Sequence, residues 1–518
     1  MVKCRRLCGA VGAVVGVLGG VIGILLLVAI IRAATLEEPD YQDWGMATGV
    51  KEELPESYLA TLPQLMATAL SIPTVSTDVG MYDTHQLLRF HEFLRESFPH
   101  VFNCSYIETE VINTYSLLFT VTGSTPELQP YLLMGHMDVV PADPTKWTHD
   151  PWVGLILPDT VTGEDYIWGR GAIDNKIGVM GIIMALNYLA KTDFQPTRSF
   201  YVAFGHDEEV RGADGAGHIS QVLQERGVTL DFLLDEGTPV ISGLMPGFTV
   251  PTALISVTEK GYMTLQLQVE GEGGHSSIPP QDPAVSRLVA ALNNLALNPQ
   301  PSLFGKGPEG DTFTYLATKA SWPYKLFYSN LWLFSPLLEL VMSRSRESNA
   351  LLRTTTSITI VRAGVKENVV PSSASAIINH RVHPAQSLDD VIQHDLAAIN
   401  DPTVKLTVKQ QMAAHPVSPY GPDVPGWRLL TSAIHHHFPG AVVAPAVMMA
   451  NTDSLHYLNL TSCIYRHYPI HLTKKDISGI HGSDERLSVT NLRQATRIYH
   501  RVMVWAGDAA GPPQHHQE

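Results

Sequence analysis

The stretch SFYVAFGHDEE, residues 199–209, joins an apolar run directly to a row of ionisable side chains. Its run Phe200–Phe204 predicts a buried strand, because short aromatic and β-branched segments are typical of strands inside a sheet. The acidic pair Glu208–Glu209 then follows the carboxyl end of that strand. Like charges on neighbouring residues repel each other, and carboxylates are poorly hydrated near a core. The pair is therefore costly unless a group of opposite charge neutralises it.

Two further apolar runs end in polar residues in the same way. Tyr131–Met134 leads to His136, and Phe232–Leu234 leads to Asp235. Between them, Ile177–Leu189 carries apolar residues at helical spacing. Strands that alternate with helices are typical of an α/β fold with a mostly parallel central sheet and helices on both faces. Open sheets of this kind bind ligands at the carboxyl ends of their strands, which is where these polar residues fall.

The pattern changes at about residue 259, where we expect a smaller α+β lid or dimerisation domain to be inserted. Residues 264–270, 355–361 and 374–382 are predicted strands, and residues 283–297 are a predicted helix. A chain of 518 residues is also too long for one ordinary core. The predicted catalytic domain therefore has two parts, 51–258 and 396–506, on either side of a lid domain at 259–395. A polar linker is expected at 36–50 and a disordered tail at 507–518.

The N-terminus has the pattern of a secretory signal. Lys3, Arg5 and Arg6 precede an uncharged apolar run from Leu7 to Ile31. This run exceeds the roughly 20 residues that cross a bilayer, and basic residues before such a run stay cytosolic. Residues 1–35 therefore form either an uncleaved signal anchor or a cleaved signal peptide. In both cases we expect the body in the secretory pathway, either secreted and extracellular or membrane-anchored with its catalytic part on the lumenal side.

The composition is that of a globular protein, with 45% hydrophobic and 16% charged residues. A formal net charge of −15 argues against a nucleic acid as the main partner. Cys104 and Cys463 are the cysteines of the body, and either a disulfide or two free thiols fits them. Asn103 and Asn459 each stand in a glycosylation sequon, which agrees with a lumenal location.

Five motifs place metal-binding side chains at predicted strand ends or turns. They are GHMDVVP with His136, GRGAIDNK with Asp174, GHDEE with Glu208 and Glu209, DEG with Asp235, and IHGSDER with His481. Each residue alone has a simpler explanation as a cap or a surface group. Together, two histidines and several carboxylates are the ligands of a hydrolytic zinc centre. One bridging carboxylate would let five side chains hold two ions about 3.5–4 Å apart, and such a pair lowers the pKa of bound water to about 7.

A hydrolytic centre also needs a general base that does not bind metal. Adjacent glutamates can divide these tasks, one binding metal while the other faces the water. Other motifs are weaker candidates for chemistry. His435, His436 and His437 are consecutive and cannot share one helix face. Ser276 and Ser277 lack the G-x-S-x-G surroundings of a nucleophilic serine.

The order of HMDVVP, GRGAIDNK, GHDEE, DEG, GGHSS and HGSDER makes the sequence similar to the aminoacylase/carboxypeptidase S family of dizinc exopeptidases. The resemblance covers about residues 50–505 and implies a zinc-exopeptidase catalytic domain with two Zn²⁺ per chain. It implies that His136 and Asp235 hold one ion, that Glu209 and His481 hold the other, and that Asp174 bridges both.

The same resemblance assigns two catalytic groups. Asp138 would orient His136, and Glu208 would take the proton of the water and later pass it to the leaving amine. One position departs from the family. Its members usually have a second aspartate directly after the bridging one, and this chain has Asn175 there. We expect a changed backbone or hydrogen-bond contact there and an intact dizinc site.

In the lid, the resemblance assigns substrate contacts to His275 of GGHSS, Asn368 of KENVVP and Arg381 of NHRVHP. His275 would stabilise the oxyanion, often across a dimer, because donors aimed at developing charge are large catalytic terms. Arg381 suits two-pronged binding of an α-carboxylate. The simpler alternatives are a turn histidine for His275 and a structural salt bridge for Arg381.

These residues favour a zinc-dependent amidohydrolase of N-acyl amino acids. Stretches such as LQPYLLMGHMDVVPA and AGVKENVVP resemble a secreted branch of the family that acts on N-fatty-acyl amino acids. The expected small-molecule partners are then fatty-acyl amino acids, fatty acids and amino acids, with condensation as the reverse reaction at the same site. The alternatives are a carboxypeptidase or dipeptidase acting on small peptides with a free C-terminus, and a metal-free binding protein.

Two interactions of the whole chain are also expected. The lid would support a homodimer, and the N-terminus would allow association with a membrane or a lipoprotein. The unusually apolar segment Trp322–Met342 fits a core, a dimer face or the lining of a channel for a long acyl chain.

Overall fold

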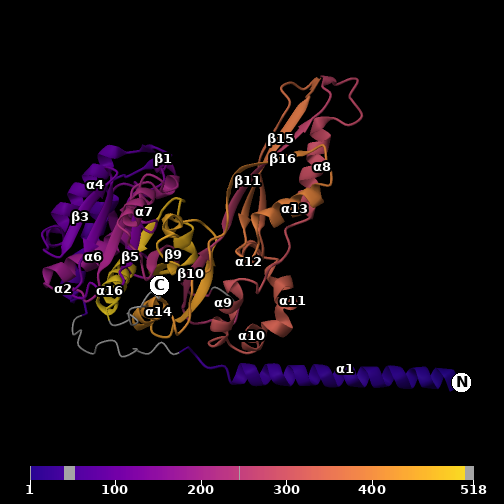
Figure 1. Ribbon diagram of the computed structural model, residues 1–518, viewed down its shortest axis with the longest axis horizontal. Coiled ribbons are helices and arrows are strands. Elements are labelled where there is room, and N and C mark those ends of the chain that lie inside the picture. Colours follow the sequence, from indigo (N-terminus) through magenta and orange to yellow (C-terminus); the bar gives the residue numbers. More distant parts are fainter. Residues whose placement is uncertain (1, 40–52, 244–245, 508–518) are drawn as a thin grey trace.

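The computed structural model describes residues 2–39, 53–243 and 246–507 (Figure 1). Most of the predicted linker (36–50) and nearly all of the predicted tail (507–518) lie outside the described residues, so these two expectations stay predictions. A large sheet covered by helices forms the main body, and a second sheet projects from it (Figure 1). A long N-terminal helix, α1 (Val2–Ala34), runs along the bottom of this view.

The central sheet has parallel strands in its middle and antiparallel pairings on both sides of them. In the described residues its strands are β3 (Ile107–Ile112), β4 (Ser116–Val121), β5 (Tyr131–His136), β8 (Phe200–Gly205), β9 (Leu233–Ile241), β10 (Thr252–Glu259), β17 (Val442–Met448) and β18 (Ile464–Leu472). Their order is β17-β10-β18-β9-β5-β8-β4-β3. The neighbours β18, β9, β5 and β8 are parallel, whereas β4 and β3 are antiparallel to the strand before them. The carboxyl ends of β5, β8 and β9 therefore meet at one edge.

Both faces of the central sheet are covered, because successive residues of a strand point to opposite faces. In β5, Tyr131 and Leu133 pack into a large core, whereas Leu132 and Met134 pack into a smaller core on the other face. The large core is covered by α2 (Glu56–Leu59), α3 (Leu62–Leu70), α4 (Thr84–Ser97), α5 (Pro99–Phe102), α6 (Lys176–Lys191), α14 (Pro425–His437) and α16 (Val489–Trp505). The smaller core is covered by α7 (Ala216–Glu225) and the 3-10 helix η3 (Asp453–Tyr457). The predicted α/β architecture is confirmed.

The projecting sheet is antiparallel, as expected of the smaller α+β domain. It consists of β11 (Gly261–Glu270), β13 (Thr355–Ala363), β15 (Ser373–Val382) and β16 (Lys405–Met412), in the order β13-β15-β11-β16. Helices α8 (Ala284–Leu297) and α13 (Leu388–Ile399) share its core. Alternate residues of β11, from Met263 to Val269, are buried in that core. The alternation explains why this strand could be located from its sequence.

The small sheet extends further along the chain than predicted. We expected the chain to return to the catalytic part at residue 396, but β16 pairs with β11 from Met412↔Tyr262 to Lys405↔Gln268. Because ladder hydrogen bonds fix β16 to the edge of the small sheet, the return comes after β16. The chain is back at the large sheet by His415, whose backbone N–H donates to the carbonyl of Glu259 at the end of β10, 3.0 Å away.

Four helices inside the predicted lid segment pack against the large sheet instead. They are α9 (Pro308–Ala317), α10 (Tyr324–Tyr328), α11 (Leu331–Met342) and α12 (Arg346–Leu352). Phe313 of α9 and Leu338 of α11 share a core with Val442 and Ala444 of the edge strand β17. The inner side of the Trp322–Met342 segment is therefore core, which is one of the three alternatives for it.

The remaining described elements are short. They are β1 (Ser76–Asp78), β2 (Met81–Tyr82), β6 (Leu155–Pro158), β7 (Asp165–Trp168), β12 (Gly274–His275), β14 (Val369–Val370), β19 (Arg486–Ser488), α15 (Lys474–Ile477) and the 3-10 helices η1 (Pro144–Lys146) and η2 (Glu208–Val210). Cys104 and Cys463 are free thiols, so of the two alternatives for them the structure has the unpaired one. Asn103 and Asn459 are both exposed, which leaves the sequons accessible.

Candidate metal centre

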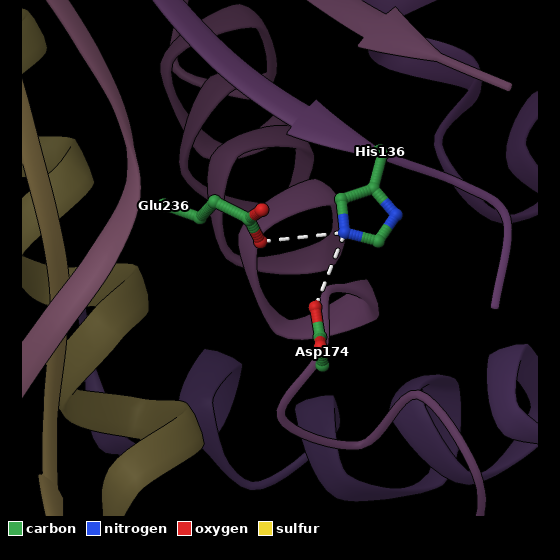
Figure 2. A group of neighbouring side chains, drawn as sticks. All are labelled: His136, Asp174 and Glu236. Atoms are coloured by element: carbon green, nitrogen blue, oxygen red, sulfur yellow. Dashed lines mark hydrogen bonds and ion pairs between the residues drawn. The ribbon is translucent and has the colours of Figure 1, made fainter. Parts of the chain in front are cut away.

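Three side chains converge at the carboxyl edge of the central sheet. Figure 2 shows His136 from the end of β5, Glu236 from β9 and Asp174 from the loop before α6 pointing toward one another. The Nε2 atom of His136 lies 3.2 Å from Asp174 Oδ1 and 3.3 Å from Glu236 Oε2. The three ligand atoms lie within 4.8 Å of one another, which is close enough for one cation to contact all of them.

A second group of three shares Asp174 with the first. The Nε2 atom of His481 lies 2.9 Å from Asp174 Oδ2 and 3.2 Å from Glu209 Oε2. The two carboxylate oxygens of Asp174 therefore face two different histidines, His136 and His481. This is the arrangement of a carboxylate that bridges two ions. Four of the five predicted ligands, namely His136, Asp174, Glu209 and His481, are brought together in this way.

The fifth predicted ligand, Asp235, does not join either group. Its carboxylate accepts the backbone N–H of Glu236 at 2.8 Å and the backbone N–H of Ser454 at 3.0 Å. Its neighbour Glu236 faces His136 in this structure, and the role of Asp235 as a ligand stays a prediction. The phenol of Tyr468 also donates to Glu236 Oε2 at 2.5 Å.

An irregularity in β9 explains why the strand presents Glu236. Asp235 is opposite Arg466 of β18, but the next residue of β18, His467, is opposite Thr238, so β9 carries extra residues at this point. Such bulges re-aim side chains next to active sites. Gly237 lies within this bulge, where a Cβ atom would stand 2.6 Å from the Arg466 backbone. The glycine of DEG is therefore required for the close approach of the two strands.

Asp138 fixes the geometry of three neighbours at once. Its buried carboxylate accepts the backbone N–H groups of Glu208 at 3.1 Å and of Glu209 at 3.2 Å. Its Oδ1 atom also lies 3.3 Å from Nδ1 of His136, and that nitrogen donates to the Asp138 carbonyl at 3.0 Å. Nδ1 of His136 is thereby engaged, which leaves Nε2 to face the cluster. This contact agrees with the orienting role predicted for Asp138.

Glu208 and Glu209 turn toward different histidines. Glu208 Oε2 lies 3.9 Å from Nε2 of His136, whereas Glu209 Oε2 contacts His481. Burial raises the pKa of Glu208 well above its usual range, and the carboxylates of Glu236 and Asp453 add to this effect. Burial also raises the pKa of Glu209 to about 7. The protein alone therefore neutralises the negative charges of the two glutamates poorly.

The cluster fits metal cations. Hydrogen bonds to Asp174 and Glu209 raise the pKa of His481 to about 10. Burial opposes the charging of His136, but the carboxylates of Glu236, Asp138 and Asp174 still raise its pKa well above 6.5. Oε1 of Glu209 is buried without a hydrogen-bond partner. A cation at each group of three would supply the missing partner, and imidazole with carboxylate ligands suits zinc.

Glu485 holds the loop that carries Asp174, and the sequence alone did not single it out. Its buried carboxylate accepts the backbone N–H groups of Gly171, Ile173 and Asp174 at 2.7–3.1 Å. It also pairs with the Arg170 guanidinium at 2.7 Å. Its place in HGSDER, four residues after His481, was the available signal. Asn175, the departure from the family, caps α6 by accepting the N–H of Gly178 at 3.1 Å.

The predicted lid residues lie in two places. His275 is exposed on β12, with Nδ1 at 2.7 Å from Ser277 Oγ, and the carbonyl of Asn368 accepts the adjacent N–H of Ser276 at 3.1 Å. In the described part of this single chain, His275 does not contact the His136 and His481 groups. Arg381 lies nearer the large sheet, since its Nη1 donates to Asn451 Oδ1 at 2.7 Å. Its guanidinium also stacks 5.1 Å from the ring centre of Tyr262.

A mostly parallel α/β sheet with buried histidines and carboxylates at its carboxyl edge, together with a smaller inserted sheet, defines the class of two-domain metallopeptidase-like hydrolases. The comparisons agree with this class. Residues 132–504 match the family described as Peptidase family M20/M25/M40. The chain belongs to this peptidase family.

Two relatives and one solved structure are similar to most of the chain. The chain is 40% identical, over 95% of both sequences, to the N-fatty-acyl-amino acid synthase/hydrolase PM20D1 of Xenopus tropicalis. It is 39% identical to "Probable carboxypeptidase S-like 2" of Dictyostelium discoideum, over 85% of this chain and 84% of that protein. The fold matches the M20 family metallo-carboxypeptidase Sso-CP2 of Sulfolobus solfataricus with a TM-score of 0.59 at 14% identity, covering 86% of this chain and 99% of that one.

Proposed function

We propose that this protein is a zinc-dependent amidohydrolase that cleaves N-fatty-acyl amino acids into fatty acids and free amino acids. The observation that carries the proposal is the 40% identity, over 95% of both chains, to a relative named as an N-fatty-acyl-amino acid synthase/hydrolase. The paired groups around Asp174 support the metal dependence of the reaction. Hydrolase activity itself follows from the family.

The two ions would be held by two sets of side chains that share Asp174. His136 completes one set with Glu236, which faces it in the structure, or with Asp235, the predicted ligand, and Glu209 and His481 complete the other. When bound, zinc would lower the pKa of water and polarise the amide carbonyl. The chain itself would fix the ligand positions through Asp138 and Glu485, which hold the backbone on either side of the cluster.

Glu208 would move the proton during the reaction. Its carboxylate lies beside His136 but belongs to neither group of three, so it is free to accept a proton. In the hydrolytic direction it would take a proton from the attacking water and deliver it to the nitrogen of the leaving amino acid. Its burial supports this role, because a raised pKa brings a carboxyl group closer to the working pH of a general base.

Two lid residues would bind the substrate. Arg381 presents its guanidinium beside Asn451, and a free α-carboxylate would replace or join that amide as its partner. His275 would donate to the oxyanion, as the resemblance implies, and Asn368 would contact the substrate beside it. Since His275 is exposed in the single chain, it would reach the site by closure of the lid or from a second copy. Synthesis would use the same residues in reverse, with the concentrations of fatty acid and amino acid deciding the direction.

Replacement of the proposed base tests the mechanism. We expect Glu208→Gln to lower turnover of oleoyl-phenylalanine by about 10²–10⁴-fold, while metal analysis still finds about two zinc ions per chain. The matched control is Asp207→Asn, a neighbouring carboxylate that accepts the N–H groups of Asp214 and Gly215 and belongs to neither group of three. Full turnover in Glu208→Gln would refute the role of this residue, and a protein without zinc would refute the metal centre.

The second candidate is a carboxypeptidase or dipeptidase, favoured by the 39% identity to the carboxypeptidase S-like relative. Its metal chemistry would be the same, and only the acyl pocket would differ. A panel that compares oleoyl-phenylalanine with dipeptides ending in phenylalanine separates the two functions. Faster cleavage of the dipeptides would favour the peptidase.

The location of the enzyme is also a proposal. Helix α1 contains one stretch, Val15–Ala34, that is long and apolar enough to cross a membrane, and signal sequences near an N-terminus have the same property. We infer a lumenal or extracellular body with glycans on Asn103 and Asn459. Protease protection and a glycosidase mobility shift test both statements.

A further inference from the structure

Helix α11 is apolar on both of its sides. Its inner side packs into the core next to β17, where Leu338 is buried and Leu331 and Met342 are half-buried. Its outer side exposes Trp332, Leu337, Leu340 and Val341 at exposed fractions of 47–55%. These residues follow helical spacing, so they form one continuous strip, which we call the α11 outer face. Trp322, just before α10, is exposed to a similar extent.

Such a strip is unusual for a helix surrounded by water. A helix that is apolar all round is normally buried in protein or in a membrane. Within Leu331–Met342 the only charged residue is Glu339. The helix has 12 residues, or about 18 Å, which is too short to cross a bilayer of about 30 Å. It is therefore suited to lie along a bilayer surface rather than to span it.

The apolar N-terminal helix is docked beside this strip. Asn330 Nδ2 donates to the carbonyl of Ala29 at 2.9 Å, and Ala29 and Ala33 are fully buried by the contact. The indole of Trp332 donates to the side-chain oxygen of the same Asn330 at 3.1 Å. Just beyond the helix, Glu38 forms an ion pair with Lys319. Figure 1 shows α1 running past α10 and α11.

The contact fixes the depth of the strip. Ala29 lies five positions before Ala34, so its carbonyl is about 7.5 Å from the end of the apolar stretch at 1.5 Å per residue. Helices that lie in a bilayer surface bury their apolar face by about 5–10 Å. Tryptophan is enriched at this level, because its ring is apolar and its N–H is polar. In a bilayer crossed by α1, Trp332, which is hydrogen-bonded to the residue that contacts Ala29, would stand at this interfacial depth.

We propose that the α11 outer face is a lipid-docking surface that inserts into the bilayer crossed by α1. The occupant is a phospholipid bilayer, because the strip continues the apolar surface of a helix long enough to span one. The body is thereby held against the membrane at a second point, in addition to the anchor. This inference does not depend on which substrate the enzyme cleaves.

Tryptophan quenching by brominated lipids tests the surface. The full chain is reconstituted into vesicles of phosphatidylcholine with brominated acyl chains, which quench only tryptophans that reach the hydrocarbon. Helix α1 has no tryptophan, so any quenching reports on the rest of the chain. We expect wild type to be quenched and Trp322→Phe/Trp332→Phe to lose at least half of that quenching. Phenylalanine preserves the apolar surface, so the double variant keeps the same docking.

The matched control is Trp147→Phe/Trp152→Phe, which removes two tryptophans elsewhere on the body. It is expected to keep the absolute quenching of wild type. Equal quenching in wild type and Trp322→Phe/Trp332→Phe would overturn the proposal. If Leu340→Glu instead converts a dimer into a monomer in detergent, with no change in quenching, the strip is a contact between two copies and the proposal is also wrong.

Discussion

Asp138 shows how a single residue separates the roles of an adjacent acidic pair. Its carboxylate accepts the backbone N–H groups of both Glu208 and Glu209, so the two side chains are held in a fixed relation. Glu209 is directed to His481, whereas Glu208 is directed to His136. The repulsion that makes such a pair costly is then relieved by the histidines and, when bound, by metal.

A paired substitution tests which carboxylate of DEG, Asp235 or Glu236, binds metal. Glu236→Gln is expected to lower zinc content from two ions toward one per chain, because Glu236 faces His136 and Asp174. Asp235→Asn is expected to retain both ions, since the Asp235 carboxylate is occupied by the N–H groups of Glu236 and Ser454. Elemental analysis of the purified variants gives the answer. The opposite result, with zinc lost only in Asp235→Asn, would identify Asp235 as the ligand.

A buried histidine far from the metal centre predicts acid sensitivity. Burial lowers the pKa of His500, on α16, from 6.5 to about 4, and its ring packs on Tyr188. Between these values the unfolded chain binds more protons than the folded chain, so the free energy of unfolding falls as the pH drops from 6.5 toward 4. His500→Phe keeps a ring and removes the titration. Between pH 7 and pH 5, we expect the free energy of unfolding of this variant to fall by about 2 kcal/mol less than that of wild type, measured by chemical denaturation.

At the scale of elements, two local irregularities build the site. The bulge in β9 presents Glu236, and the loop before α6 presents Asp174. Both depend on contacts from distant segments, because β18 supports the bulge and Glu485 supports the loop. Neither feature belongs to the regular pattern of strands and helices.

The hydrogen bonds from the loop before α6 predict a positioning role for Glu485. Glu485→Gln keeps the size of the side chain but weakens its charge-assisted bonds to Arg170 and to the loop N–H groups. We expect zinc affinity to fall by about 10- to 100-fold, measured by competition with a chelator, with turnover recovering at high zinc concentration. Asp484→Asn is the matched control, because within the described residues the carboxylate of this neighbour accepts hydrogen bonds from Thr148 and none from the Asp174 loop. Unchanged zinc affinity in Glu485→Gln would contradict the role.

At the scale of the whole molecule, Arg381 connects the two sheets. It extends from β15 of the small sheet to Asn451, and Asn451 Nδ2 donates to Glu259 at 3.2 Å. Glu259 in turn forms a buried ion pair with Arg466 of β18. A substrate carboxylate bound at Arg381 would therefore lie where the small sheet joins the catalytic sheet, so closure of the lid and binding of the substrate would be linked.

Substrate comparison tests this position of Arg381. Arg381→Lys keeps the charge but loses the two-pronged geometry for a carboxylate. We expect kcat/KM for oleoyl-phenylalanine to fall by about 10- to 100-fold, with little change for the oleoyl-phenylalanine amide, which lacks the carboxylate. An equal fall for both substrates would show a structural role for Arg381 rather than recognition of the carboxylate.

The periodicity of the sequence predicted three strands of the central sheet (β5, β8 and β9) and the helix α6, and it located the carboxyl edge of that sheet. Hydrophobic alternation is local, so β5, β8, α6 and α8 were predicted to within a few residues. The motifs also marked His136, Asp174, Glu209 and His481, because their residue types are unusual beside a core. The domain boundaries were less accurate, since strand pairing assigns β16 to the small sheet and side-chain packing assigns α9–α12 to the large one.

Only the tertiary structure brought Glu236 to His136 and placed Asn330, at the start of α11, beside α1. The first contact depends on a bulge against β18, whose residue Arg466 is far along the chain from Glu236. The second depends on a hydrogen bond between residues 301 positions apart, Asn330 and Ala29. Local patterns carry no information on which distant backbone approaches a given residue. That information comes from the packing of the complete chain. Only the folded chain determines which polar groups are paired and which apolar surface is buried, and both contribute to its free energy.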